Sequence, residues 1–284
     1  MKGVTRASGH RRRNLARRLN RDGPRVDKIH SFQERVLRLF GIGIVSLMLA
    51  ALGARLLRLA RRHRARPELW LGSAFLCAAV GTSLISIAAV ETLPQRVALA
   101  LSLWAQAGLS IAIACVATFT WSVFRPTSAA ARALAPALIA ANLAGGVAFW
   151  WSGSPLPVGR IGLCILLARN AVLMWLFVES ALYARRMRRR SRLGLADPVL
   201  VNRFSLWAIW TGALAVIPLF ALVLRMQGAL VTPVPGAPLA AGLRAVFAVL
   251  GAGGAVATVA CWLAFFPPAA YRRWITSRAT AASV

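Results

Sequence analysis

Histidine, lysine and cysteine are scarce in this chain of 284 residues, and each shortage excludes a class of site. The three histidines, His10, His30 and His63, lie outside every long apolar run, which excludes haem held by two histidines within a bilayer. No lysine lies in an apolar run, so a retinal Schiff base has no attachment point. The four cysteines form no C-x-x-C pair, so we expect no metal site and no cofactor.

Acidic residues number only seven, and their positions exclude the common intramembrane proteases. A membrane aspartyl protease needs paired aspartates inside its spans, whereas Asp22, Asp27 and Asp197 all lie outside the apolar runs. A rhomboid-type serine protease needs a histidine within the membrane, and the apolar runs contain none. We therefore expect that the chain is not an enzyme.

Apolar residues dominate instead, with 58% hydrophobic residues and a mean hydropathy of +0.65. A helix needs about 20 apolar residues to cross the hydrocarbon of a bilayer. Seven such runs occur, at 36–57, 68–90, 97–123, 133–151, 161–183, 205–224 and 244–266. The sequence therefore predicts an all-α polytopic membrane protein, with a bundle of seven transmembrane helices at 36–266, a basic N-terminal tail at 1–35 and a short C-terminal tail at 267–284.

The basic residues lie between the apolar runs and predict the topology. Apart from Lys2 and Lys28 they are all arginines, and they gather in segments 58–66, 125–132, 185–203 and 272–278. Because cytoplasmic loops of membrane proteins carry an excess of arginine and lysine, we expect an outer N-terminus and a cytoplasmic C-terminus in a bacterial inner membrane. We expect the basic segments to contact anionic headgroups of the lipid bilayer and not nucleic acid, since no zinc-finger spacing or aromatic-basic pattern is present.

The N-terminal tail conflicts with this topology, because 1–35 is itself strongly basic. One hypothesis is that translation starts at Val26, which could be encoded by a GTG start codon, and this start would leave a nearly neutral tail. The alternatives are a disordered basic arm that lies on anionic lipid, or an inverted topology. All three remain open at this point.

Arg169 is a charge within a predicted span, about 12 Å below the outer surface at 1.5 Å per residue. An unpaired arginine at such a depth costs a few kcal/mol or more, so it needs a partner. At nearly the same depth we place four polar residues: Thr82, Gln106, Asn142 and Asn170. They form either a structural layer of interhelical hydrogen bonds or a pocket in which Arg169 binds an anion.

Two acidic residues near the cytoplasmic side have predicted structural roles. Glu179 lies one turn from the end of the fifth span, where we expect a salt bridge with Arg185 or Arg186. Asp197 precedes Pro198, and this pair is typical of a helix cap followed by a new helix.

Three segments carry a resemblance: FTWSVFRP at 119–126, GLADPVLVNRF at 194–204 and FFPPAAYRRW at 265–274. They resemble segments of a family of uncharacterised bacterial seven-helix integral membrane proteins, some of which are similar to the membrane-sensor halves of signalling proteins. The resemblance implies the fold and a sensory role, without catalytic residues to carry over. Since little chain follows the seventh span, we expect the signal to pass to a separate cytoplasmic partner. The residues proposed to dock this partner, or to anchor at the interface, are Asp197, Arg203, Arg272 and Arg273.

Together these features predict a sensor or receptor-like module that binds a small ligand, with an anion as one option, from the outer side. The residues proposed to bind the ligand are Arg169, Asn170, Gln106, Asn142 and Thr82. The alternative prediction is a small-molecule transporter or permease.

Overall fold

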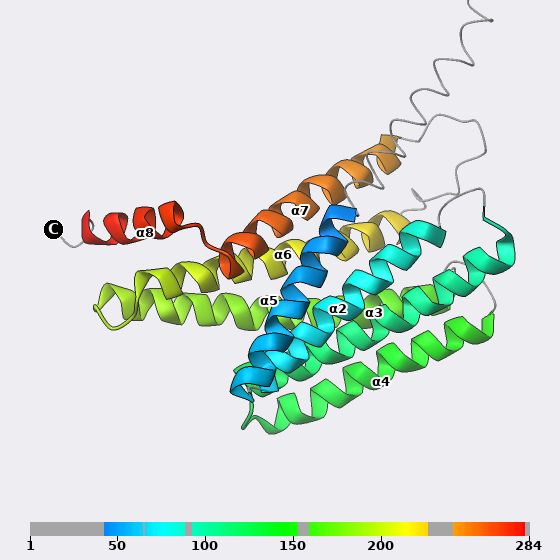
Figure 1. Cartoon of the computed structure of the whole chain (residues 1–284). Coiled ribbons are helices and arrows are strands. Elements are labelled where there is room, and N and C mark those ends of the chain that lie inside the picture. The colour runs from blue at the N-terminus through cyan, green and yellow to red at the C-terminus, as the bar shows by residue number, and fades with distance from the viewer. Residues whose placement is uncertain (1–42, 65, 89–92, 153–158, 227–240, 282–284) are drawn as a thin grey trace, which may run out of the picture. The chain divides into compact units, whose positions relative to one another are not determined.

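The computed structural model describes residues 43–64, 66–88, 93–152, 159–226 and 241–281. Within these ranges the chain is helical and has no strand (Figure 1). The helices are a first helix at Gly43–His63, then α2 (Arg66–Ala88), α3 (Gln95–Phe124), α4 (Ala129–Ser152), α5 (Gly159–Arg192), α6 (Pro198–Met226), α7 (Ala241–Phe265) and α8 (Ala269–Ala281). The chain divides into two compact units, Met1–Ile44 and Val45–Val284, and every contact described below lies within the second unit.

Six of the described helices are long and apolar enough to cross a membrane, which confirms an all-helical, multi-pass membrane protein. The apolar stretches are Gly43–His63, Arg66–Ala88, Gln95–Phe124, Ala129–Trp151, Gly162–Ser191 and Pro198–Val216. Described parts of α7 and α8 qualify only as a pair, Gly253–Phe265 and Ala269–Ser277, that is bent by 84°. By length and composition the described residues therefore contain six candidate spans, or seven if this bent pair is one span, and the count of seven stays a prediction.

The fifth helix is longer than the predicted span, since it continues past Tyr183 to Arg192. Arginine is a good helix former, so the basic segment extends the helix until glycine stops it. Gly194 adopts a positive φ of 70°, and the Leu195 N–H donates to the Arg190 carbonyl at 2.9 Å, as in a glycine-terminated helix. The next helix starts at once, because the Asp197 carboxylate accepts from the Val199 N–H at 2.9 Å, which confirms the predicted cap.

Successive helices pack against one another from α2 to α7, and α3 also contacts α5. The buried hydrophobic cluster draws its residues from the first helix, α2, α3, α5, α6 and α7. Its centre is an aromatic cluster of Phe75, Trp207, Trp210 and Phe265, whose ring centroids lie 4.9–6.1 Å apart in mostly edge-to-face geometry. Rings at these distances attract one another beyond the area that they bury, so the aromatic cluster joins α2, α6 and α7.

Glycine allows the first helix to lie close to α2. A Cβ atom on Gly53 would be 2.9 Å from the Gly72 carbonyl oxygen, and one on Gly72 would be 3.1 Å from the Gly53 carbonyl oxygen. The two backbones therefore touch where each helix has no side chain. Small residues at such crossings are typical of membrane helices, where close packing is the main attraction between helices.

We expect Gly53→Ala to destabilise the protein, because the new methyl group meets backbone atoms that cannot rotate away. Overpacking of this kind costs about 1–3 kcal/mol, more than the gain in helix propensity from alanine. The measurement is thermal unfolding of the detergent-purified protein, followed by the loss of the monodisperse peak. Gly254→Ala is the matched control, since a Cβ atom there has nothing within 4 Å. Equal melting temperatures for the two variants would contradict the close crossing.

Candidate functional site

Arg169 on α5 lies within a polar cluster that connects three helices. Its Nη1 donates to the Gln106 side-chain oxygen at 2.8 Å, and its Nε donates to Asn142 Oδ1 at 3.2 Å. Its Nη2 donates to the Ser110 hydroxyl at 3.1 Å and to the Gln106 carbonyl at 3.4 Å. Arg169, Gln106, Ser110 and Asn142 are called the Arg169 cluster below.

The rest of the cluster is also well bonded. Asn142 is 0% exposed, and its amide donates to the Ser110 carbonyl at 3.0 Å. Four of the five guanidinium N–H groups have an acceptor, because Nη2 makes two bonds and Nε and Nη1 make one each. The geometry thus fits the structural interpretation, in which Arg169 joins α3, α4 and α5.

The structure brings together only part of the layer that the sequence predicts. Gln106 and Asn142 contact Arg169, whereas Thr82 pairs with the Ser46 hydroxyl at 2.9 Å. Asn170 is 6% exposed, and its Oδ1 has no hydrogen-bond partner among the described residues. Sequence reasoning missed Ser110, although it follows Gln106 by four residues and so lies on the same helix face.

The predicted partner of Glu179 is wrong. Its carboxylate pairs with Arg125, the residue that follows the end of α3, whose Nε lies 2.8 and 3.0 Å from the two oxygens, and not with Arg185 or Arg186 of its own helix. The α3–α5 contact explains the difference, since it brings the end of α3 beside Glu179. Sequence spacing shows neighbours along one helix but not across two.

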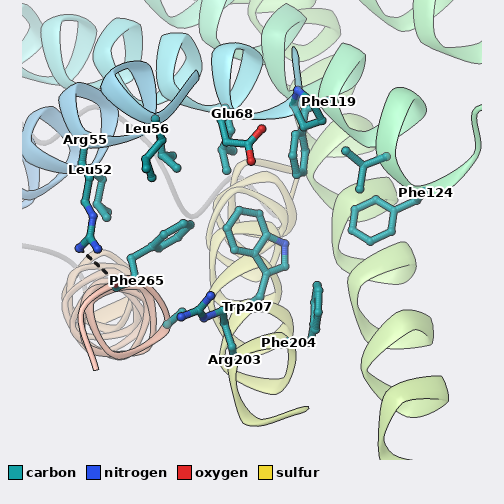
Figure 2. A pocket seen from close by; sticks show the side chains of 15 residues that line it. Leu52, Arg55, Leu56, Glu68, Phe119, Phe124, Arg203, Phe204, Trp207 and Phe265 are labelled. Atoms are coloured by element: carbon teal, nitrogen blue, oxygen red, sulfur yellow. Dashed lines mark hydrogen bonds between the residues drawn. The ribbon is translucent and has the colours of Figure 1, made fainter. Parts of the chain in front are cut away.

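A cavity of about 420 Å³ is lined by Phe119, Val123 and Phe124 at the end of α3, whereas Gln106 and Ser110 of the Arg169 cluster lie in the first half of that helix. It is lined by the second half of the first helix, by the last turns of α3 and α7 and by the first turns of α2 and α6, and it is open on one side (Figure 2). This end is called the arginine-rich end, because the basic segments 58–66 and 185–203 begin there. The volume lies within the range of about 300–1,000 Å³ that is usual for small-molecule sites.

The cavity has apolar walls with a few polar groups. Leucines and aromatic rings form most of its surface, and the charged side chains that line it are Arg55, Glu68 and Arg203. The guanidinium of Arg55 donates to the Phe265 carbonyl at 3.2 Å and lies 4.5 Å from the centroid of the Phe266 ring. Glu68 Oε2 and the indole Nε1 of Trp207 are buried, and neither has a hydrogen-bond partner among the described residues. A cavity with unsatisfied polar atoms is typical of a binding site.

Sequence reasoning did not find this cavity, although two of its charges were visible signals. Arg55 lies inside the predicted first span, and Glu68 opens the second. Glu68 is favourable in the first turn of α2, where the helix dipole is positive, so its presence there alone does not indicate a site. Only the packing of five helix ends places both charges around one space.

The residues proposed for docking or anchoring are separated in the structure. Asp197 caps α6, and Arg203 lines the cavity. Arg272 and Arg273 are exposed on α8, which is joined to α6 by a hydrogen bond of 3.0 Å from the Asn202 amide to the Tyr271 hydroxyl. Among the residues described, no group of three histidine, cysteine or acidic side chains could hold a metal ion.

Comparison of this chain with protein-family models, with curated proteins and with solved structures finds no match. The resemblance to seven-helix sensor proteins therefore stays an expectation from the sequence, and the case for function depends on the geometry of the two sites.

We expect Arg169→Leu to lower the free energy of unfolding by about 1–3 kcal/mol for each buried acceptor that is left without a donor. The acceptors at risk are the Gln106 and Asn142 side chains. The measurement is thermal unfolding in detergent, with Arg96→Leu, an exposed arginine at the start of α3, as the control. A stable Arg169→Leu protein that has lost only a ligand response would instead support an anion pocket at Arg169.

Proposed function

We propose that this chain is a receptor-like membrane protein that binds a small ligand in the cavity at the arginine-rich end. The observation that carries the proposal is an apolar cavity of about 420 Å³ that is lined by Glu68 and Arg203, two charged side chains that pair with no other described residue. A buried polar group without a partner costs free energy, and a ligand that supplies the partner recovers it.

The Arg169 cluster is a weaker candidate for the ligand site. Four guanidinium donors of Arg169 already bond to Gln106, Ser110 and Asn142, so an anion would have to replace neutral acceptors that are in place. The proposal therefore moves the ligand from the predicted outer side to the arginine-rich end, and it assigns to Arg169 the structural role.

The inner wall of the cavity favours binding over transport. Trp207 and Phe265 line the cavity, and behind them Phe75 and Trp210 complete the aromatic cluster. Leu52 and Leu71, which also line the cavity, are almost fully buried. A ligand could pass deeper only if these packed rings moved apart, and close-packed cores resist such movement.

We also propose that the chain has seven spans, with its N-terminus outside and its C-terminus in the cytoplasm of a bacterial cell. The arginine-rich end then faces the cytoplasm, as the positive-inside rule requires. In this orientation α5 and α6 extend their basic ends toward a cytoplasmic partner, and the exposed Leu193 and Leu195 between the two helices offer it an apolar contact.

The orientation predicts which engineered thiols react in intact cells. In a cysteine-free background, Thr127→Cys, between α3 and α4, should react with a membrane-impermeant maleimide only after lysis. Gln95→Cys, at the start of α3, should react in intact cells because it lies on the outer side. The reverse pattern of labelling would contradict the proposed topology.

Leu59→Trp tests the cavity as the ligand site. Leu59 lines the cavity and is 36% exposed, so an indole there should fill the space with little effect on folding. A ligand is first found by screening amino acids, amines and carboxylic acids in thermal-shift assays. We expect the variant to bind this ligand at least about tenfold more weakly, since a loss of about 1.4 kcal/mol in binding free energy is enough for a tenfold change in affinity.

Leu47→Trp is the matched control, because Leu47 lies on the same helix, is 73% exposed and does not line the cavity. Equal affinities in both variants would place the ligand elsewhere. Accumulation of the same ligand in proteoliposomes would support the transporter instead.

A further inference from the structure

Charges of both signs line the cavity at the arginine-rich end without pairing with each other. Arg55 is engaged by the Phe265 carbonyl and the Phe266 ring. Arg203 has no ion pair or hydrogen bond within the described residues, and Glu68 Oε2 is buried without a partner. Figure 2 shows the Trp207 ring between Glu68 and Arg203. The cavity thus separates one carboxylate from one available guanidinium.

Aromatic rings surround the space between these charges. Phe119, Phe124, Phe204, Trp207 and Phe265 all line the cavity. The faces of such rings attract an ammonium group, and a nearby carboxylate strengthens the attraction. Trp207 is 8% exposed, and its indole nitrogen is covered and lies on the edge of the ring away from Arg203 (Figure 2), so Arg203 is the donor for an anionic oxygen. The two ends of the cavity therefore suit groups of opposite charge.

We propose that the ligand is a small zwitterion with an apolar body, in the class of aromatic or large aliphatic amino acids. Its ammonium group lies against Glu68 and the aromatic rings, and its carboxylate accepts from Arg203. Its side chain packs on the apolar wall that includes Leu52 and Leu71. This inference rests on the proposed function, because it specifies the ligand of the same cavity.

Ligands with one charge fit the cavity less well. A simple anion would satisfy Arg203 but would leave the Glu68 carboxylate unpaired in a cavity that then holds a second negative charge. A simple amine would satisfy Glu68 but would leave Arg203 without a partner and would add a positive charge beside Arg55. A two-chain phospholipid meets a different obstacle, since the aromatic cluster closes the inner wall against its acyl chains.

The test compares three probes that share one apolar body: L-phenylalanine, 3-phenylpropanoate, which lacks the amine, and 2-phenylethylamine, which lacks the carboxylate. Binding to the full-length protein in detergent is measured by calorimetry. We expect L-phenylalanine to bind at least about tenfold more tightly than either analogue, since hydrogen bonds to charged groups are the stronger kind.

Charge-neutralising variants assign each end of the ligand. Glu68→Gln should weaken L-phenylalanine about tenfold or more and should favour 3-phenylpropanoate, because the like charge is gone. Arg203→Gln should weaken L-phenylalanine similarly and favour 2-phenylethylamine, whereas Arg203→Lys should retain most of the affinity. Arg58→Gln removes an exposed arginine that does not line the cavity, and should bind as the unmodified protein does. Melting temperatures without ligand check that each variant is folded.

Three results would overturn the inference. The first is that L-phenylalanine does not bind, and the second is that 3-phenylpropanoate binds as tightly as L-phenylalanine with an affinity that Glu68→Gln does not change. The third is that lysophosphatidylethanolamine binds and none of the three probes does. The last two leave the proposed function standing if Leu59→Trp still abolishes binding. Failure of Leu59→Trp to affect any probe would instead remove the cavity as the ligand site, so the two failures are distinct.

Discussion

The packing of Phe75, Trp207, Trp210 and Phe265 is the contact on which the rest of the described structure depends. These rings come from α2, α6 and α7, which are far apart in sequence and can meet only if the helices pack in this order. In a membrane, water does not drive helices together, so dense packing of this kind supplies much of their attraction. Two of these rings, Trp207 and Phe265, also line the cavity, and this joins the stability of the bundle to the shape of the cavity.

The Arg169 cluster holds the other helices in a different way. It connects α3, α4 and α5 through hydrogen bonds from one guanidinium to neutral oxygens of Gln106, Ser110 and Asn142. Neutral acceptors satisfy the donors of an arginine without cancelling its charge, which is the arrangement expected of a fixed structural contact or of a site awaiting an anion. The number of bonds already made favours the first. An apolar packing centre and a polar centre thus stabilise different groups of helices.

A site at helix ends has a clear physical advantage in such a protein. Charged side chains near the headgroups keep access to water, so Glu68, Arg55 and Arg203 cost less there than at mid-membrane depth. The part of the wall formed by Leu52 and Leu71 is apolar and almost fully buried. A ligand with a polar head and an apolar body meets both environments in one cavity, and its binding would alter contacts among the first helix, α2, α3, α6 and α7 together. Such a change in helix contacts is what a receptor would transmit to a partner.

The sequence alone determined the class of the protein. Long apolar runs permit only helices in a bilayer, because every backbone hydrogen bond must be made within the segment. Asp197 before Pro198 also predicted a helix cap correctly, since a cap depends on local chain geometry. The partner of Glu179, the isolation of Thr82 from Arg169 and the cavity around Glu68 required the tertiary structure. Depth along a helix can be counted from sequence, but the face that each helix turns to its neighbours is decided by packing against them.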